Sequence, residues 1–524
     1  MNRRRFLAAS AAASAAAPAL LTGSCSRYQT IPGSILGASH AAGHRLRQGI
    51  GFPKPTREVK TDVVIAGGGI AGLAAARRLR QLGVANLQIL DLEHAVGGAS
   101  ICGSNSVSAY PWGAHYVPLP GKDCREVLQF FEEIQLITGH DAAGRPIYDE
   151  LALCHDPQER LFMHGEWQEG LAPTAGLTKS ERDQFIAFAS EIERWKSRQI
   201  FTLPVDRSKL DPEALSLDTI TMAEWMARQG FDCAPLLWQV DYSCQDDFGG
   251  NLSEVSAWAG IHYFASRTGE AANAEHETVL TWPSGNGWLV DQLKLNISDS
   301  IRPNQLIYQI TPQAHGADVL SFDTRLNEVI RYKARSVICA LPRFIAQRII
   351  PGLAPISGLE YSPWVVINLT LDELPPSPGV LPAWDNVIYG SSALGYVNAG
   401  HQSLSSRPIE TVITHYEALS GQPPAKLREW MLTQNHHQWV QRSAEALKAP
   451  HPDLSGHIKN ADIWLWGHGM IRPKPGFLWG KERQLMQEHR PPIYFAHSDM
   501  SGMSLFEEAY TRGFTTAETV FQAF

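Results

Sequence analysis

The sequence predicts an α/β protein in which a parallel sheet flanked by helices is joined to a second domain of mixed α+β structure. Residues 61–66 form a short β-branched run that is typical of a buried parallel strand. A glycine-rich turn and a segment with helical periodicity follow this run. The chain has 524 residues, of which 44% are hydrophobic, so it is long enough for more than one globular domain.

The composition excludes some classes of function. The chain has 45 Lys and Arg against 53 Asp and Glu, a formal net charge of -8, which argues against nonspecific nucleic-acid binding. None of the seven cysteines forms a CxxC pair, and no Cys/His group has zinc-site spacing. We therefore expect no structural metal and no nucleic-acid partner.

The N-terminus predicts an export signal. Residues 1–25 contain a basic start and then an Ala-rich apolar run to Leu21, which is the pattern of a secretory signal. The stretch Arg3-Arg4-Arg5-Phe6-Leu7 resembles the twin-arginine consensus, which implies a periplasmic protein. An uncleaved basic membrane anchor is the alternative. Lipidation of Cys25 would tether the protein to a membrane without a spanning helix.

Residues 26–60 are rich in Gly, Ser, Pro and His, and we expect them to form a linker. No later segment supplies the roughly 18 uninterrupted apolar residues of a transmembrane helix.

A dinucleotide-binding fingerprint follows the first predicted strand. Residues 67–72 read GGGIAG and match GxGxxG, residues 73–82 are predicted to be helical, and residues 84–90 form a second predicted strand that ends at Asp91. Gly67 permits a tight turn, Gly69 lets the backbone approach a pyrophosphate, and Gly72 lets helix and strand pack closely. The helix start, at Ile70 and Ala71, offers free N–H groups to phosphates. Asp91 can accept hydrogen bonds from ribose hydroxyls.

The residues after Asp91 favour FAD over a nicotinamide cofactor. Asp91 and Leu92 are followed by Gly97-Gly98, a spacing that resembles the flavin amine oxidase family and the broader glutathione-reductase-like flavoproteins. The resemblance implies a Rossmann-like FAD-binding domain of the glutathione-reductase type. Members of the family often have Arg after the two glycines, where this chain has Ala99. No second GxGxxG with a following acid is present, so we expect no separate nicotinamide domain.

The resemblance continues along the chain. It places Trp112, Gly113, Ala114 and His115 beside the isoalloxazine ring and the backbone of Ile307 beside adenine. Residues 283–289 resemble the family's Pro-Gly-Gly segment, and residues 335–342 resemble a strand that ends in Pro.

The C-terminal segment gives a second signature of the family. Residues 493–499 resemble the closing strand, with Asp499 at the acidic position near the pyrophosphate and His497 where Gly is usual. Ser504 and Leu505 precede a predicted helix whose free N–H groups would face the N1–C2=O edge of the flavin.

The segments that match define the expected domains. The FAD-binding domain is predicted from residues 61–130, 276–345 and 456–524, and the substrate domain from residues 131–275 and 346–455. Within the substrate domain we expect helices at residues 181–196, 221–229 and 427–448, and a strand at residues 361–371.

The resemblance implies an aromatic cage that holds a neutral amine against the flavin. The candidates for this cage are Trp464, Trp466, Trp479, Tyr396 and Tyr416, and the alternative is that they are core aromatics.

Three polar side chains are further catalytic candidates. His115 lies next to the predicted flavin face, His468 is a candidate base, and Arg472 a candidate ligand of a substrate carboxylate, unless it pairs with a surface acid.

One departure from the family concerns the electron acceptor. Many members have a Lys on the substrate-domain strand, hydrogen-bonded through water to the flavin N5, and residues 364–370 contain none. A dehydrogenase that passes electrons to a quinone or to another protein is therefore an alternative to an oxidase. The same FAD motifs are also compatible with a desaturase-like or protoporphyrinogen-oxidase-like enzyme acting on C–C bonds, and with a noncatalytic FAD-binding protein.

Overall fold

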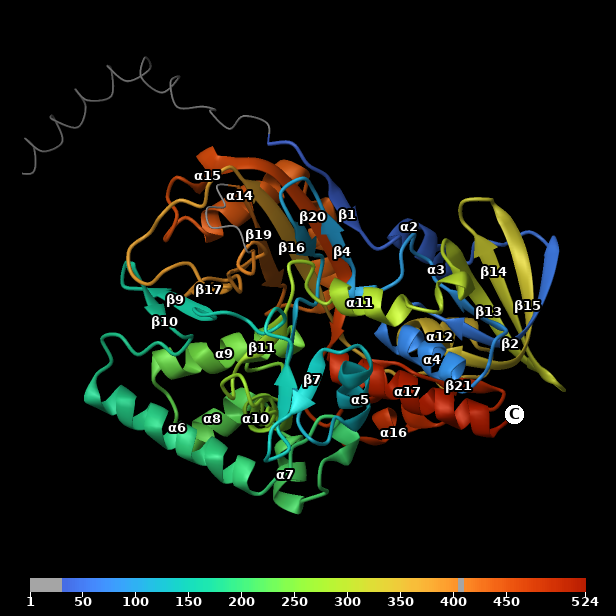
Figure 1. Ribbon diagram of the computed structural model, residues 1–524, viewed down its shortest axis with the longest axis horizontal. Helices are drawn as coiled ribbons and strands as arrows, with labels where there is room; N and C mark the ends of the chain where they lie inside the picture. The colour runs from blue at the N-terminus through green and yellow to red at the C-terminus, as the bar shows by residue number, and fades with distance from the viewer. Residues whose placement is uncertain (1–30, 404–409) are drawn as a thin grey trace, which may run out of the picture.

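The computed structural model describes residues 31–403 and 410–524, which form two lobes joined along a central seam (Figure 1). The first lobe is built on a seven-stranded sheet in the order β12-β3-β2-β15-β14-β13, with β21 beside β15. Parallel pairing joins β12, β3, β2, β15 and β21, whereas β13 and β14 are antiparallel. The strands are β2 (Arg57–Ala66), β3 (Leu87–Leu90), β12 (Ile301–Arg302), β13 (Gln305–Gln313), β14 (Gly316–Asp323), β15 (Glu328–Cys339) and β21 (Ile493–Phe495).

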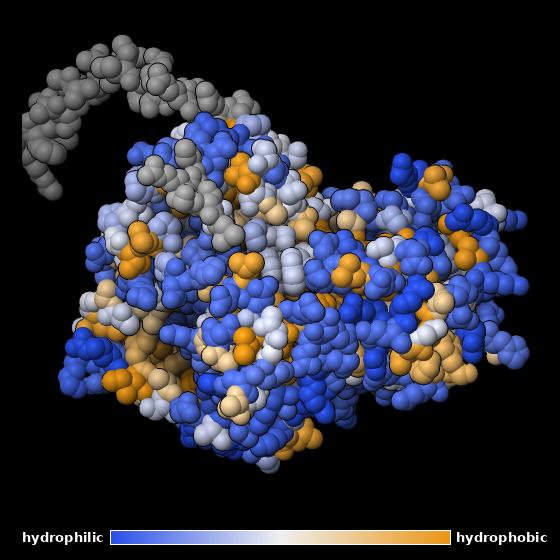
Figure 2. Space-filling view, in the orientation of Figure 1, coloured by the Kyte–Doolittle hydropathy of each residue, from blue (hydrophilic) through white to orange (hydrophobic). Residues whose placement is uncertain are grey.

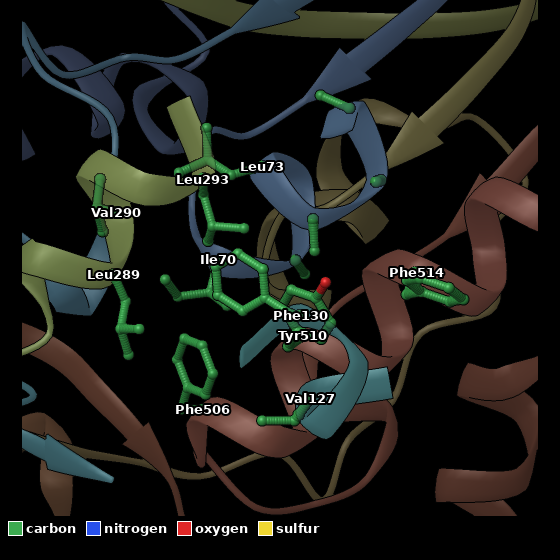
Figure 3. Close-up of a cluster of buried hydrophobic side chains, with 14 of the residues drawn as sticks. Ile70, Leu73, Val127, Phe130, Leu289, Val290, Leu293, Phe506, Tyr510 and Phe514 are labelled. Carbon is green, nitrogen blue, oxygen red and sulfur yellow. The ribbon is translucent and has the colours of Figure 1, made fainter. Parts of the chain in front are cut away.

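Four helices pack together beside this sheet and share one apolar core (Figure 3). They are α4 (Ile70–Gln81), α5 (Arg125–Glu133), α11 (Gly287–Lys294) and α17 (Phe506–Gln522). The Phe130 and Tyr510 rings stack with centroids 4.9 Å apart. A Cβ added at Gly513 of α17 would lie 2.1 Å from the carbonyl oxygen of Ala71 in α4. The close packing of α4 and α17 fixes the N-termini of both helices with respect to each other.

The second lobe contains an eight-stranded sheet in the order β1-β20-β16-β19-β18-β17-β9-β10. Its strands are β1 (Ile35–Gly37), β9 (Glu159–Met163), β10 (Glu166–Glu169), β16 (Tyr361–Leu371), β17 (Asp385–Ile388), β18 (Tyr396–Asn398), β19 (Thr411–Ala418) and β20 (Ile458–Ile471). A group of helices lies below it in Figure 1: α6 (Lys179–Ser197), α7 (Pro212–Leu217), α8 (Met222–Gln229), α9 (Ala234–Phe248) and α10 (Ala257–Ala265).

The remaining elements are short or lie at the edges of the two lobes. They are α2 (His40–Gly43), α3 (Arg45–Gln48), β4 (Cys102–Ser104), β5 (Ala109–Pro111), β6 (Tyr116–Pro118), β7 (Ile137–His140), β8 (Pro146–Tyr148), β11 (Val279–Thr281), α12 (Arg343–Ile349), α13 (Pro424–Thr433), α14 (His436–Ala446), α15 (Leu454–His457) and α16 (Lys481–Gln487).

The α/β fold and most of the predicted elements are confirmed. Strand β2, helix α4 and strand β3 follow one another as the fingerprint predicts, and α6, α8 and β16 lie where periodicity placed them. The predicted helix at residues 427–448 is instead two helices. Asn435 begins α14 with a capping box, accepting a hydrogen bond from the backbone N–H of Gln438, and this interrupts the helix.

Two domain boundaries differ from the prediction. Residues 458–471 were expected in the FAD-binding domain, but they form β20, which pairs along its length with β16 of the second sheet. Residues 26–60 were expected to be a linker, but the described part of this segment contains β1, α2, α3 and the start of β2. Strand β1 is ordered because it pairs with β20 in parallel, from Ile35 with Ile463 to Gly37 with Leu465.

The surface in Figure 2 is mostly hydrophilic, with apolar residues scattered over it. Within the described residues no helix is long and apolar enough to cross a bilayer. The predicted signal at residues 1–25 and Cys25 lie outside the described part of the chain.

Candidate functional site

The glycine-rich turn between β2 and α4 combines tight packing with one open side. Gly67 has a φ of +103°, and a Cβ there would lie 2.8 Å from the carbonyl oxygen of Ala340. A Cβ on Gly72 would lie 1.9 Å from the carbonyl oxygen of Gly67, so only glycine lets the helix approach the turn. Gly69 is different, because its φ is -72° and the nearest atom to an added Cβ is 3.9 Å away. The protein itself therefore does not require glycine at position 69.

Helix α4 begins at this turn without a capping side chain. Gly69 is its N-cap residue, and the first-turn residues Ile70, Ala71 and Gly72 are buried. The backbone N–H groups of a first helical turn have no acceptor within the helix. Buried N–H groups at an uncapped helix start form a site for an anion such as a pyrophosphate. The residues present therefore fit a dinucleotide.

Asp91 lies at the end of β3, beside the glycine turn. Its two carboxylate oxygens accept hydrogen bonds from the backbone N–H groups of Gly68, at 2.7 Å, and Glu93, at 2.8 Å. Burial raises the pKa of Asp91, although the two N–H groups act in the opposite direction. The Gly97 N–H donates to the Gly68 carbonyl oxygen over 2.8 Å. The Gly97–Gly98 turn is thus joined directly to the glycine-rich turn between β2 and α4.

A large pocket lies between the two lobes, with about 1120 Å³ of open space. It is lined by the backbone stretch from Gly113 to Tyr116, by strands β16, β19 and β20, and by the start of α17. Its polar and aromatic lining residues include His115, Tyr116, Asp246, Asp247, Arg267, Tyr416, Trp466, Ser504 and Glu507. The pocket thus brings together residues from both predicted domains.

His115 is an uncharged imidazole in the wall of this pocket. Burial lowers the pKa of His115 to about 4, so the ring is neutral at pH 7. Its Nδ1 lies 3.1 Å from the carbonyl oxygen of Gly113. A carbonyl only accepts hydrogen bonds, so we assign the proton to Nδ1, which leaves the lone pair on Nε2. The ring lies against Tyr416, with centroids 4.9 Å apart.

Carboxylates form the other side of the pocket. Asp246 accepts a hydrogen bond from the Tyr116 hydroxyl at 3.1 Å, and Asp247 forms an ion pair with Arg267 at 2.8 Å. Glu507, at the start of α17, is only 2% exposed and makes no ion pair within the described residues. Burial raises the pKa of Glu507 to about 7 and that of Asp247 to about 6. Three carboxyl groups therefore face one guanidinium group.

Comparison with known proteins identifies the fold. Residues 65–134 match the family described as an NAD(P)-binding Rossmann-like domain. No curated protein sequence matches the chain. A wild-type putrescine oxidase bound to putrescine is similar in structure over 89% of this chain and 100% of its own, with a TM-score of 0.60 and 15% identity. This chain has the fold of the flavin amine oxidases.

Two further solved structures have this flavin amine oxidase fold. Cyclohexylamine oxidase from Brevibacterium oxydans matches over 88% of this chain and 99% of its own, with a TM-score of 0.64 and 13% identity. A putative protoporphyrinogen oxidase from Exiguobacterium matches over 90% of this chain and 100% of its own, with a TM-score of 0.60 and 14% identity.

The flavin amine oxidase fold brings two of the five predicted cage aromatics to the pocket. Trp466 and Tyr416 line it, and the Trp466 Nε1 donates to the carbonyl oxygen of Trp112 at 2.6 Å. The other three are core residues, as the alternative interpretation expected. Trp464 packs against Trp112, Tyr396 bonds to Arg160 and His451, and Trp479 packs against Trp258.

Arg472 does not reach the pocket, which corrects its prediction as a ligand of a substrate carboxylate. It is 3% exposed and forms an ion pair with Glu254 at 2.9 Å. Its guanidinium also donates to the Ser362 hydroxyl, at 3.0 and 3.1 Å. These interactions neutralise the charge of Arg472 and occupy its N–H donors. The side chain therefore links β20 to neighbouring elements and is not free to bind a substrate.

His468 also lies outside the pocket lining, so its prediction as the base is corrected. Its ring stacks on Phe344, with centroids 4.4 Å apart. The side chain is exposed to solvent, although protein surrounds it closely enough that desolvation lowers its pKa to about 4. The positive charges of Arg428, His44, Arg47 and Arg348 lower the pKa further.

Gly113 and Ala114 have a role that the sequence did not indicate. A Cβ on Gly113 would lie 2.3 Å from the carbonyl oxygen of Ala99, and the Ala114 N–H donates to that same oxygen at 2.8 Å. Gly113 is therefore required by contact between two protein segments, and it still lines the pocket together with Ala99 and Ala114. The Trp112 ring is buried behind this stretch.

The C-terminal candidates lie at two places. Ser504 and Leu505 line the pocket, and Leu505 precedes α17 without a capping side chain. Asp499 is buried nearby and accepts hydrogen bonds from the Arg343 N–H, at 2.8 Å, and from the Tyr361 hydroxyl. Burial alone would raise the pKa of Asp499, but His497 and these bonds lower it on balance.

Two of the remaining predicted cofactor residues lie at the far end of the site. Leu92 packs with an apolar cluster beside β13. The side chain of Ile307 is buried in the core, so its backbone alone is available to a ligand, and the strand register shifts between Ile307 and Gln309.

Four charged residues of the pocket were not predicted from the sequence: Asp246, Asp247, Arg267 and Glu507. Asp246 and Asp247 follow each other in α9, and Glu507 precedes another acid at the start of α17. A pair of adjacent acids within an otherwise apolar and aromatic helix is the signal that could have found them.

Proposed function

We propose that the protein is an FAD-dependent oxidoreductase that oxidises a C–N bond of a positively charged amine. The observation that supports this proposal most strongly is the composition of the pocket. One part of its lining is formed by the predicted flavin-side residues His115, Tyr416 and Trp466, and another part by the carboxyl groups of Asp246, Asp247 and Glu507. Solved structures with the same fold support the proposal, since their names include putrescine oxidase and cyclohexylamine oxidase.

The chain offers residues for each part of FAD. The α4 N-terminus and Gly69 would hold the pyrophosphate, Asp91 the ribose, and the backbone of Ile307 the adenine. Ala99, Gly113, Ala114 and the start of α17 would surround the ring. When bound, FAD supplies the hydride acceptor for the C–H bond next to the substrate nitrogen.

The charged residues of the pocket would bind and orient the amine. An ammonium group gains both Coulombic and hydrogen-bond energy beside buried carboxylates, and these carboxylates are destabilised without a cation. Arg267 neutralises Asp247, and Asp246 accepts a hydrogen bond from Tyr116, so Glu507 is the one of the three carboxyl groups without a side-chain partner in the described residues. With a pKa raised by burial to about 7, Glu507 can hold or release a proton at neutral pH.

His115 would position the reacting end of the substrate. Its neutral ring provides a lone pair at Nε2, which can accept a hydrogen bond from an amine N–H. Tyr416 and Trp466 would provide apolar faces beside it.

The charge of the pocket favours an amine over a polyene or a tetrapyrrole. Chemistry at C–C bonds of large apolar molecules would require a long pocket without charges. The pocket contains three carboxyl groups and Arg267, and burying them against an apolar substrate would cost several kcal/mol. The structural similarity to a putative protoporphyrinogen oxidase therefore carries less weight than the chemistry of the pocket.

Gly69→Ala tests whether FAD occupies the glycine turn. The fold tolerates this change, because the backbone angle is ordinary and the nearest atom to the new Cβ is 3.9 Å away. We expect a folded protein with an unchanged melting temperature and at least tenfold weaker FAD binding, since the methyl group would occupy the space of the pyrophosphate. Flavin absorbance of the purified protein, measured with its melting temperature, separates the two effects.

Asp91→Ala is expected to reduce the FAD content as well. Gly72→Ala is the matched control, because its Cβ would collide with the Gly67 carbonyl oxygen and destabilise the fold itself. Full FAD occupancy in both Gly69→Ala and Asp91→Ala would contradict the assignment of the turn.

We also propose that residues 1–25 direct export to the periplasm and that lipidation of Cys25 tethers the protein to a membrane. The support is the sequence Arg3-Arg4-Arg5-Phe6-Leu7 and the apolar run that follows it. Replacing both Arg3 and Arg4 with Lys should trap the precursor in the cytoplasm, measured by cell fractionation. Equal export of the variant would contradict the assignment. Cys25→Ser should release the protein from the membrane fraction.

A further inference from the structure

We infer that residues 34–48, which we call the strap, form part of the cofactor site, where Arg47 supplies positive charge and His44 a hydrogen-bond donor to the pyrophosphate. They act together with Arg348 and Arg428, and the Gly97–Gly98 turn is followed by Ala99, which carries no charge. This inference rests on the proposed binding of FAD. It assigns an anion-binding role to a segment that the sequence predicted to be a linker.

The strap connects the two lobes across the seam between them (Figure 1). At one end β1 pairs with β20 of the eight-stranded sheet. Two residues after β1, the backbone N–H and the hydroxyl of Ser39 both donate to the Glu93 carboxylate, each at 2.8 Å. Glu93 lies two residues after Asp91, the predicted ribose ligand, so the strap is fixed to the rim of the dinucleotide site.

Packing also fixes the short helices of the strap. Leu46 packs against the apolar cluster that contains Leu306, Phe322 and Val329, and Leu92 belongs to the same group. An added Cβ on Gly43 would lie 3.8 Å from Leu92. Helices α2 and α3 therefore lie beside the loop that follows Asp91.

Three arginines and His44 lie close enough to His468 to affect its pKa. The charges of Arg428, His44, Arg47 and Arg348 all lower the pKa of His468, after the larger effect of desolvation. Within the described residues, none of the three arginines forms an ion pair, and Arg428 donates only to the backbone carbonyls of Tyr361 and Gly467. Like charges that have no ion-pair partner repel one another, and an anion bound among them would relieve this repulsion.

The position of this basic cluster matches the expected path of the pyrophosphate. The ring of His468 lies 5.9 Å from that of Tyr361, whose hydroxyl bonds to Asp499. Asp499 is at the predicted pyrophosphate position, and Leu92 follows Asp91, the predicted ribose ligand. Because the strap pairs with β20 just before His468 and lies beside Leu92, Arg47 can reach this path, and arginine is well suited to bind phosphate oxygens. His468 is solvent-exposed yet surrounded by protein, as expected in a cleft.

Arg45, the other arginine of the strap, already packs against two aromatic rings. Arg45 lies over the rings of Phe52, at 4.7 Å, and Phe322, at 4.4 Å. Its role is to hold α3 against the sheet. Because Arg45 packs against these two rings, Arg47 is the arginine of the strap that is available to a ligand.

The test measures the dissociation constant of FAD for the deflavinated protein by quenching of flavin fluorescence. We expect Arg47→Ala to weaken FAD binding by roughly tenfold and the His44→Ala/Arg47→Ala double variant by more, with a smaller salt dependence of binding in both. ADP, which carries the diphosphate, should bind more weakly to the variants, whereas riboflavin, which carries none, should be unaffected. Lys54→Ala is the matched control, because it removes an exposed positive charge from the same stretch of chain outside the cluster.

A second set of measurements distinguishes weaker FAD binding from a folding defect. FAD should protect the wild-type strap from trypsin cleavage at Arg45 and Arg47, and the melting temperatures without FAD should be equal in the wild type and in Arg47→Ala. Unchanged binding of FAD and ADP in the double variant would overturn the inference and leave the proposed function intact. Failure of the wild type to bind FAD at all would overturn both.

Discussion

Glu507→Gln is expected to lower kcat/KM for an aliphatic diamine by roughly a hundredfold, which corresponds to about 2.7 kcal/mol of lost transition-state stabilisation. Glu507 is 2% exposed and lines the pocket without an ion-pair partner in the described chain. The amide keeps the shape of the side chain and removes its charge, so an ammonium group would lose its main electrostatic partner. FAD content should remain that of the wild type, because the change lies on the substrate side.

The pH dependence gives the same prediction a second readout. The raised pKa of about 7 means that the Glu507 carboxyl group is protonated, and therefore neutral, below that pH. Attraction to an ammonium ion requires the ionised form, so kcat/KM of the wild type should fall as the pH decreases through about 7. In Glu507→Gln this step should be absent.

Glu508→Gln is the matched control for both measurements. Its carboxylate accepts a hydrogen bond from the Val205 N–H at 2.6 Å, and it does not line the pocket. A decrease in kcat/KM of equal size in both variants would indicate a structural effect of the α17 N-terminus. A Glu507→Gln enzyme with unchanged kcat/KM would exclude Glu507 as the residue that binds the amine.

Molecular oxygen is expected to be a poor electron acceptor, with reoxidation roughly a hundredfold slower than in an oxidase that has the strand lysine, a difference of about 2.7 kcal/mol. Electron transfer to oxygen separates charge, and a nearby positive group lowers its barrier. Strand β16 contributes Trp364 and Val366 to the pocket, and neither carries a charge. We propose that the natural acceptor is a quinone or another protein.

Other residues in the pocket do not replace the missing lysine. Burial lowers the pKa of His115 and His262 to about 4, so both are neutral at pH 7. Of the described residues in the lining, Arg267 is the one Arg or Lys, and Asp247 neutralises it at 2.8 Å. Stopped-flow mixing of the dithionite-reduced enzyme with aerated buffer and, separately, with a soluble quinone measures both rates. Reoxidation by oxygen at a rate equal to turnover would show that the protein is an oxidase.

The parts of the structure that could be predicted depend on local sequence. Residues 61–91 specify strand, glycine turn, helix and second strand by hydrophobic periodicity and by backbone requirements, such as the positive φ of Gly67. The segment from Tyr361 to Leu371 alternates along its length and forms β16 as expected. In these segments the same hydrophobic pattern predicts the helix or strand and determines which of its faces is buried in the fold.

The parts that could not be predicted depend on contacts between distant residues. Asp246 and Glu507 meet in one pocket although 261 positions separate them in the sequence. Arg472 looked available for a substrate, and only the fold shows that Glu254 and Ser362 already bind it. The strap has the composition of a linker, and it is ordered because β1 pairs with β20 and Ser39 binds Glu93.

The most direct test of the proposed function is an anaerobic titration of the purified holoprotein, in which the flavin absorbance band is followed as substrate is added. We expect an aliphatic diamine to bleach the band stoichiometrically, with one diamine oxidised for each FAD, and an uncharged polyene to leave it unchanged. The Glu507→Gln variant should bleach much more slowly at the same diamine concentration. A flavin that stays oxidised with every amine tested, or that is bleached by the polyene instead, would contradict the assignment of this protein as an amine-oxidising flavoenzyme.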